Sequence, residues 1–192
     1  MHAVLQLALE APIRLKLEEL RLCLLTESLI EESALDILPH VTILSAAPIR
    51  DPHCLGEVAR FMAAKSDIRV EFSFVGLFRG PPRILFFGVT PTPELIGLQE
   101  ELFAAVTSAG IQVEPFPVPG RTVFHSTLGA LRNSADLSKA YAICERFDWP
   151  AVAQSNRLDL VEYFPPTIVR SFCAGKAPNP SPNPTRSALG SS

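Results

Sequence analysis

The chain has 192 residues and a formal net charge of −3, a length that fits one large domain or two small lobes sharing a core and excludes a multidomain assembly. Hydrophobic residues make up 47% of it and charged residues 19%, which excludes an intrinsically disordered chain. The negative charge would repel a long polyanion such as duplex DNA, so a nucleic-acid substrate would have to be met in a small, locally basic cleft.

Cysteine usage and the N-terminal segment indicate the compartment. The cysteines show no C-x-x-C spacing, which argues against a zinc site and against a disulfide framework. Residues 1–10 do not resemble a secretory signal, and no apolar run reaches the roughly 18 to 20 residues that cross a bilayer. We therefore expect a soluble, cytoplasmic protein with reduced, mostly buried cysteines: Cys23, Cys54, Cys144 and Cys173.

The first half of the chain predicts strand, helix, strand, helix and strand. Pro12 fits the first turn of a helix, where its missing N–H costs nothing, and Asp51 can cap the second helix. Apolar and polar residues alternate over 68–74, which predicts a half-buried strand with Phe72 and Phe74 on the same face. The predicted elements are strand 3–9, helix 12–28, strand 38–45, helix 52–65, strand 68–74 and a turn at 79–82.

The same order begins again at residue 83. Thr92 and Asp136 can cap the two helices of this half, and Gly110 can end the first of them. Two repeats are too few for a solenoid, so we predict an α+β fold with bilobal, duplicated β-α-β-α-β halves around a central cleft, related by a pseudo-twofold axis. The predicted elements are strand 84–90, helix 92–110, strand 122–130, helix 136–147 and closing strands 157–164 and 168–173.

Both halves belong to one predicted domain, 1–173, with lobe-forming halves at about 1–80 and 83–173. Residues 174–192 are rich in Pro, Ser and Asn and show no apolar period, which predicts a disordered tail.

Two of the four histidines occur in nearly the same tetrapeptide, HVTI at 40–43 and HSTL at 125–128. Each tetrapeptide lies in the second predicted strand of its half. Residues i and i+2 of a strand point to one face, so each histidine projects together with its threonine. If a twofold axis relates the halves, the two His/Thr pairs converge across the central cleft.

Two imidazoles and two hydroxyls in one cleft suit a phosphodiester. Because an imidazole has a pKa of about 6.5, one ring can accept a proton near neutral pH while the other donates one. Threonine hydroxyls can donate hydrogen bonds to the non-bridging oxygens. A two-histidine metal site is a weaker interpretation, because no third ligand recurs beside either motif. We expect neither a metal nor another cofactor.

These twin H-x-T-hydrophobic motifs, each on a strand of a duplicated half, resemble those of the 2H phosphoesterase superfamily, which includes the RNA 2′,3′-cyclic phosphodiesterases long called 2′-5′ RNA ligases. The resemblance covers about residues 3–173. It implies a bilobal LigT-like fold in which His40 and His125 act as general acid and base on a cyclic phosphate without metal, and in which Thr42 and Thr127 bind the phosphate. Ser126 departs from the apolar residue usual between the histidine and the threonine.

Other residues could hold the rest of an anionic substrate. Arg121 precedes His125 by four residues and could lie at the mouth of the cleft, although a plain surface arginine is the commoner case. Tyr163 and Phe164 could stack on a nucleobase or simply be core or rim aromatics. Two further arginines, Arg79 and Arg83, are candidates for the same task. We assign no role to His2 and His53, which we expect to be solvated or capping residues.

The sequence therefore predicts a metal-independent phosphodiesterase that opens the 2′,3′-cyclic phosphate of a nucleotide or an RNA end. We expect a monomer that binds neither duplex DNA nor a membrane. The motifs do not tell which histidine is the acid. The alternative is a noncatalytic module that binds RNA ends or nucleotides in the same cleft, although the low content of basic residues fits long RNA tracts poorly.

Overall fold

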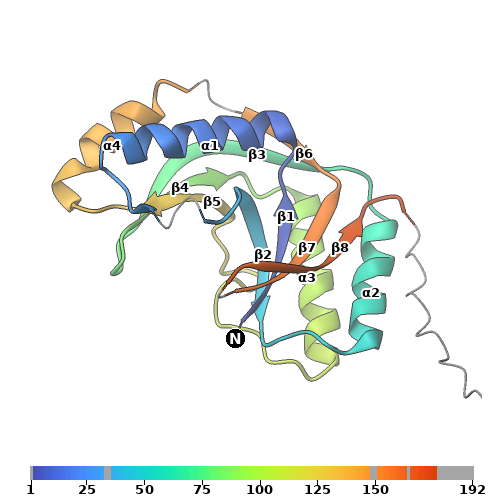
Figure 1. Ribbon diagram of the computed structural model, residues 1–192. Coiled ribbons are helices and arrows are strands. Elements are labelled where there is room, and N and C mark those ends of the chain that lie inside the picture. The colour runs from blue at the N-terminus through green and yellow to red at the C-terminus, as the bar shows by residue number, and fades with distance from the viewer. Residues whose placement is uncertain (1, 33–35, 148–150, 164, 177–192) are drawn as a thin grey trace, which may run out of the picture.

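The computed structural model describes residues 2–32, 36–147, 151–163 and 165–176. Within them, two four-stranded antiparallel sheets form the centre of the molecule (Figure 1). The first sheet has the order β2-β1-β7-β8 and consists of β1 (Ala3–Ala8), β2 (His40–Ala46), β7 (Arg157–Glu162) and β8 (Thr167–Cys173). The second sheet has the order β5-β4-β3-β6 and consists of β3 (Ile68–Phe78), β4 (Ile84–Val89), β5 (His125–Ala130) and β6 (Ala151–Ser155).

The helices are exchanged between the two sheets, in that the first helix of each half of the chain packs against the sheet that the other half opens. In Figure 1, α1 and α4 lie together along the second sheet, and α2 and α3 lie together beside the first. Accordingly, α1 contacts α4, β5 and β6, whereas α3 contacts α2 and β2 and also β3 of the second sheet. Yet α1 follows β1 of the first sheet, and α3 follows β4 of the second. The helices are α1 (Ala11–Thr26), α2 (Pro52–Ala63), α3 (Pro93–Ser108) and α4 (Leu137–Cys144).

The strands are exchanged as well. The first half of the sequence contributes β3 to the second sheet, and β7 and β8 from the end of the chain complete the first. In both sheets the strand with the motif is an edge strand paired with the strand that opens its half, β2 with β1 and β5 with β4. The predicted bilobal, duplicated α+β fold is confirmed, with two interlocked lobes whose buried apolar residues form one core.

Local signals account for most helix starts. The Asp51 carboxylate accepts the Cys54 N–H at 2.8 Å, and the Thr92 hydroxyl accepts the Leu95 N–H at 3.2 Å, as predicted. The prediction that Asp136 caps the last helix is wrong, because its side chain makes no cap hydrogen bond. Instead, Asn133 accepts from a backbone N–H and begins a 3-10 turn, Ser134–Asp136, that leads into α4.

A β-bulge in β3 reverses which side chains face the core. The register between β3 and β4 shifts between Phe72 and Phe74. Phe72 is fully buried, but Phe74 is 48% exposed, and beyond the bulge Val75 and Leu77 pack against the core instead. The prediction that Phe72 and Phe74 share a face is therefore wrong, because an inserted residue leaves no mark in an alternating pattern.

Two glycines make room for aromatic rings on the face of the second sheet that Phe74 occupies. A Cβ atom at Gly76 would overlap the ring of Phe86, and one at Gly88 would overlap the ring of Phe74. Phe86 stacks on Phe78 with 4.3 Å between ring centroids and meets Phe74 edge-on at 6.2 Å. This face of the sheet is therefore aromatic.

Three further predictions concern single features. Of the cysteines, none of which is disulfide-bonded, Cys54 and Cys144 are buried, Cys173 is partly buried and Cys23 is exposed. Across the part of the chain that the structure describes, no helix combines the length and the apolar character needed to cross a membrane. Most of the predicted tail, from residue 177 onward, and Phe164 lie outside the described residues.

An added methyl group should have opposite effects on stability at a glycine on the aromatic face and at an exposed glycine in a helix. Gly76→Ala should lower the free energy of unfolding by about 1–3 kcal/mol, because the buried Phe86 ring must move to admit the new methyl group. Gly56→Ala, in helix α2 where nothing lies within 4 Å of the added Cβ, should raise it by about 0.5–1 kcal/mol. Urea denaturation of both variants checks this, and a Gly76→Ala protein as stable as Gly56→Ala would contradict the packing described.

Candidate active site

The two motif histidines open the two edge strands that meet between the sheets. His40 is the first residue of β2 and His125 the first of β5, and these two strands contact each other. In each motif the histidine and the threonine are partly exposed, whereas the residue between them, Val41 or Ser126, is fully buried. The structure thus turns each His/Thr pair to the open face of its strand.

Each motif ends in a β-bulge. Between β1 and β2 the pairing passes from Leu44 directly to Thr42, which leaves Ile43 without a partner. Between β4 and β5 it passes from Gly129 directly to Thr127, which leaves Leu128 without one. An inserted residue re-aims the side chains beside it. The apolar fourth position of the motif is therefore the bulged residue in both strands.

Each imidazole is held by a hydrogen bond of the same kind. His40 Nδ1 lies 2.8 Å from the carbonyl oxygen of Leu38, and His125 Nδ1 lies 2.6 Å from the carbonyl oxygen of Val123. In both cases the carbonyl belongs to the residue two positions earlier. A carbonyl can only accept, so Nδ1 carries the proton and donates it. In the neutral ring this leaves the lone pair on Nε2, the atom available to a ligand.

Burial keeps both rings neutral near pH 7. It lowers the pKa of His40 to about 4, an effect that the hydrogen bond to Leu38 opposes and that the charges of Arg21 and His125 reinforce. Burial also lowers the pKa of His125, against the hydrogen bond to Val123. The charge of His125 adds to the lowering of the His40 pKa, and the strands that carry the two rings contact each other.

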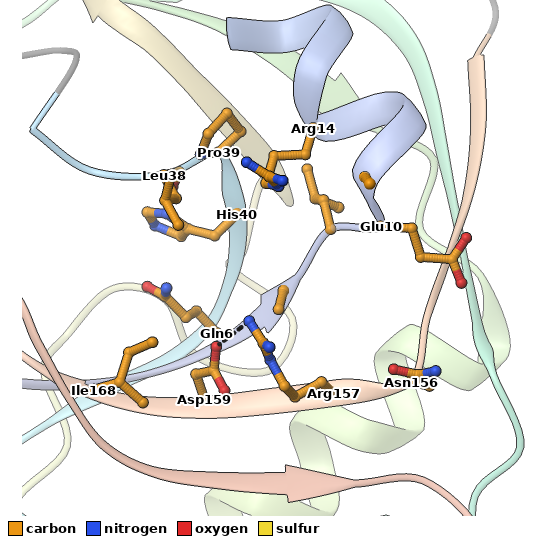
Figure 2. A pocket seen from close by; sticks show the side chains of 13 residues that line it. Gln6, Glu10, Arg14, Leu38, Pro39, His40, Asn156, Arg157, Asp159 and Ile168 are labelled. Carbon is orange, nitrogen blue, oxygen red and sulfur yellow. Dashed lines mark hydrogen bonds and ion pairs between the residues drawn. The ribbon is translucent and has the colours of Figure 1, made fainter.

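A cavity of about 460 Å³ with polar and apolar lining residues opens at His40. Arg14 of α1 and Arg157 of β7 line it together with Gln6 and Asp159 (Figure 2). Asp159 is 2% exposed and is paired with Arg157 at 3.1 Å, as Figure 2 shows. It also accepts a hydrogen bond of 2.6 Å from Ser171. Arg14 is paired with Glu18 at 2.8 Å, so each arginine at this cavity has a carboxylate beside it.

A second, more apolar cavity of about 640 Å³ opens at His125. Thr42 lines it too, so residues of both motifs meet there. The other lining side chains include three aromatic residues, Phe78, Phe116 and Tyr163. The hydroxyl of Tyr163 donates to Gln6 Oε1 at 3.0 Å, and burial raises its pKa to about 12, so it stays a hydrogen-bond donor at every relevant pH.

Two aromatic rings contact the His125 imidazole. Phe78 meets it edge-on with 4.9 Å between ring centroids, and Phe86 lies 5.1 Å away. The sequence predicts neither contact. The β3 bulge that sets the face on which Phe78 lies has no sequence signature, and Phe86 on β4 looks like any other apolar strand residue. A clue existed in the glycines of β3 and β4, since Gly in a strand often marks a close approach.

The remaining candidates are placed as follows. Arg121 is exposed at the second cavity, with its guanidinium 4.9 Å above the Phe116 ring. Thr127 is partly buried, and its backbone carbonyl accepts hydrogen bonds from Arg21. Arg79 and Arg83 line a different hollow and do not join the motif residues.

The other two histidines lie apart from the motifs. His2 is paired with Glu114 at 3.0 Å, and His53 is exposed on α2 beside a separate hollow. Within the described ranges, no group of three His, Cys, Asp or Glu side chains is arranged to hold a metal ion.

Comparisons with known proteins assign the family. Residues 9–164 match the sequence profile of the 2′-5′ RNA ligase superfamily. The chain belongs to this superfamily. A search of curated protein sequences finds no match. The resemblance to the 2H phosphoesterases, inferred from the twin motifs, is thereby confirmed.

Solved structures of the LigT type share the fold of this superfamily member. It is similar to TT0787 of Thermus thermophilus at 18% sequence identity, with a TM-score of 0.64. It is also similar to E. coli LigT, in the apo form at 12% identity with a TM-score of 0.62, and in a complex with 3′-AMP at 11% identity with a TM-score of 0.60. Each match covers 91% of this chain and 98% of the other.

The desolvated imidazole of His40 predicts a loss of stability on acidification. His40 has a pKa near 6.5 when unfolded and about 4 when folded, so between these values the unfolded state binds more protons and folding is penalised. The free energy of unfolding should fall as the pH drops from 6.5 to 4, and less steeply in His40→Asn. Urea denaturation at pH 7 and pH 5 measures this, with His53→Asn as the exposed control. If the free energy of unfolding fell equally between pH 7 and pH 5 in wild type and in His40→Asn, the desolvation of the His40 ring would be contradicted.

Proposed function

We propose that this protein is a metal-independent cyclic phosphodiesterase that hydrolyses the 2′,3′-cyclic phosphate of a nucleotide or an RNA end. The observation that carries the proposal is the matched presentation of two imidazoles, each with Nδ1 bonded to the carbonyl two residues earlier. Membership of the 2′-5′ RNA ligase superfamily and similarity in fold to a structure described as a phosphoesterase support phosphoester chemistry. The 3′-AMP bound by E. coli LigT supports a nucleotide-sized substrate.

In the proposed reaction, Nε2 of one neutral ring accepts a proton from water as the water oxygen bonds to phosphorus. Nε2–H of the other, protonated ring donates its proton to the departing ribose 3′ oxygen as the P–O3′ bond breaks. The product is a 2′-phosphate with a free 3′-hydroxyl. The hydroxyls of Thr42 and Thr127 donate hydrogen bonds to the non-bridging oxygens. Proton exchange with solvent then restores both rings.

The charges around the two rings support His40 as the base. The Arg21 guanidinium opposes protonation of His40, and burial does so more strongly, so His40 is neutral when substrate arrives. Burial alone lowers the pKa of His125 against its hydrogen bond, and a bound phosphate anion would raise it again. His125 is therefore the better candidate for the acid.

The cavity at His125 supports a nucleoside as the rest of the substrate. Its aromatic residues Phe78, Phe116 and Tyr163 offer faces and edges against which a base can pack. Arg121 at the same cavity can approach a phosphate or ribose oxygen. We propose Arg121 and Tyr163 as substrate-binding residues and a single nucleotide or RNA end, rather than duplex DNA or a membrane, as the partner.

The proposal predicts turnover of nucleoside 2′,3′-cyclic monophosphates in the presence of EDTA. His40→Ala and His125→Ala should each lower kcat by about 100-fold or more, because each removes an acid or a base. The control His53→Ala should match wild type. Chromatography of the nucleoside 2′-phosphate formed over time measures the rate for wild type and the three variants.

Two outcomes would count against the proposal. Activity that EDTA abolishes would contradict the metal-independent mechanism. Saturable binding of the same nucleotides with no turnover at any pH would instead favour the noncatalytic module.

A further inference from the structure

Two buried polar side chains lie on the inner sides of the exchanged helices. Arg21 of α1 is 3% exposed and Gln99 of α3 is 2% exposed. A buried polar group must be hydrogen-bonded if it is not to cost stability. Both side chains are bonded, and their partners lie in the segments that carry the catalytic motifs.

Arg21 connects the segment that precedes His40 to the strand that begins with His125. Its Nη1 donates to the carbonyl of Ile37 at 2.6 Å, three residues before His40. Its Nε donates to the carbonyl of Thr127 at 3.0 Å, two residues after His125, and Nη2 donates to the same oxygen.

Gln99 connects the segment that precedes His125 to the strand that begins with His40. Its Nε2 lies 2.7 Å from the hydroxyl of Thr122, three residues before His125. The same Nε2 donates at 2.7 Å to the carbonyl of Ile43, three residues after His40. Ile43 is the bulged residue of β2. The two side chains therefore occupy related places in the two lobes and make related bonds.

We infer that Arg21 and Gln99 are a matched pair of positioning residues that hold the two histidines opposite each other; we call them the clamp residues. The inference rests on the proposed function for its kinetic part. Each clamp residue is bonded three positions before a histidine, one position before the carbonyl that holds the Nδ1 of that histidine. A shift there moves the carbonyl and the ring together, and small misplacements of reacting groups slow a reaction strongly.

The strand order explains why clamp residues are needed. β2 and β5 are edge strands of separate sheets, so no ladder of backbone bonds between them fixes their relative position. Carbonyls on their open edges require donors from elsewhere. Arg21 and Gln99 each supply such a donor, and each bond ties a motif strand to a helix that follows the opening strand of the opposite sheet.

The two clamp residues join corresponding segments, but they differ in bonding and in charge: Gln99 meets the hydroxyl of Thr122 where Arg21 meets the carbonyl of Ile37. The charged groups that line the cavity at His40 are Glu10, Arg14, Arg157 and Asp159, two of each sign, and Arg21 is not among them. Arg21 is therefore an additional positive charge near this ring, and its bonds go to carbonyls rather than to a carboxylate. Gln99 brings no charge to the corresponding place near His125. The Arg21 clamp residue thus also distinguishes His40 from His125 electrostatically.

The test combines kinetics with an imidazole titration that needs no substrate. Arg21→Met and Gln99→Met should each lower kcat for a nucleoside cyclic phosphate by about 10- to 100-fold, with a smaller change in KM, because ring geometry and not substrate contact is disturbed. The matched control is Arg132→Met: Arg132 also donates to a backbone carbonyl, that of Ile30, at 2.8 Å, but not beside a histidine. It should keep the kcat of wild type.

Nitrogen-15 NMR of the histidine rings gives the second readout. Arg21→Met should raise the pKa of His40, because it removes a nearby cation, and Gln99→Met should leave that pKa close to its wild-type value. If Arg21→Met does not fold, Arg21→Lys replaces it: this variant keeps the charge and the low pKa of His40 but loses the two-carbonyl bridge, and its kcat should fall.

The outcomes separate this inference from the proposed function. Wild-type kcat in both methionine variants, or a pKa of His40 that Arg21→Met leaves unchanged, would overturn it. If the wild-type protein turns over no cyclic phosphate, the proposed function fails, and the NMR titration alone decides whether Arg21 sets the charge state of His40.

Discussion

The hydrogen bond from each motif imidazole to the carbonyl two residues earlier is the interaction on which the site depends. In a strand, a side chain that bonds back to its own backbone is held by the direction of the chain itself. Because His40 and His125 both begin a strand and both make this bond, each ring keeps Nδ1 for the protein and presents Nε2 outward. In the reaction proposed above, one of these rings stays neutral as the base and the other gains a proton as the acid.

The interlocking of the two lobes fixes the position of the two motif strands relative to each other. Two separate sheets with edge strands in contact would be free to slide, but each sheet is covered by a helix that follows the opening strand of the other. Arg21 and Gln99 on those helices donate hydrogen bonds to carbonyls of the motif strands, Arg21 to Thr127 of β5 and Gln99 to Ile43 of β2. The cavity at His125 has an aromatic lining, and the cavity at His40 has a more polar one. The two motifs are similar in backbone geometry, but their histidines therefore lie in chemically different surroundings.

The sequence predicts the features that repeat or that obey a local rule. Period-2 alternation and the residues Asp51 and Thr92 predict most strands and helix starts, and the repeated tetrapeptides predict the His/Thr face. Three features escape it because they depend on tertiary structure: the β3 bulge that turns Phe74 outward, the exchange of helices between sheets, and the burial of Arg21. An arginine within an apolar helix has no sequence mark that separates a buried bridge between carbonyls from a surface charge.

The most direct test of the central claim is a titration of the protein with a nucleoside 2′-phosphate, followed by nitrogen-15 NMR of the histidine rings. If both rings face one phosphate, the Nε2 resonances of His40 and His125 should change together along one saturation curve, while those of His2 and His53 stay constant. A change at only one motif ring, or two curves with different affinities, would contradict a shared phosphate site.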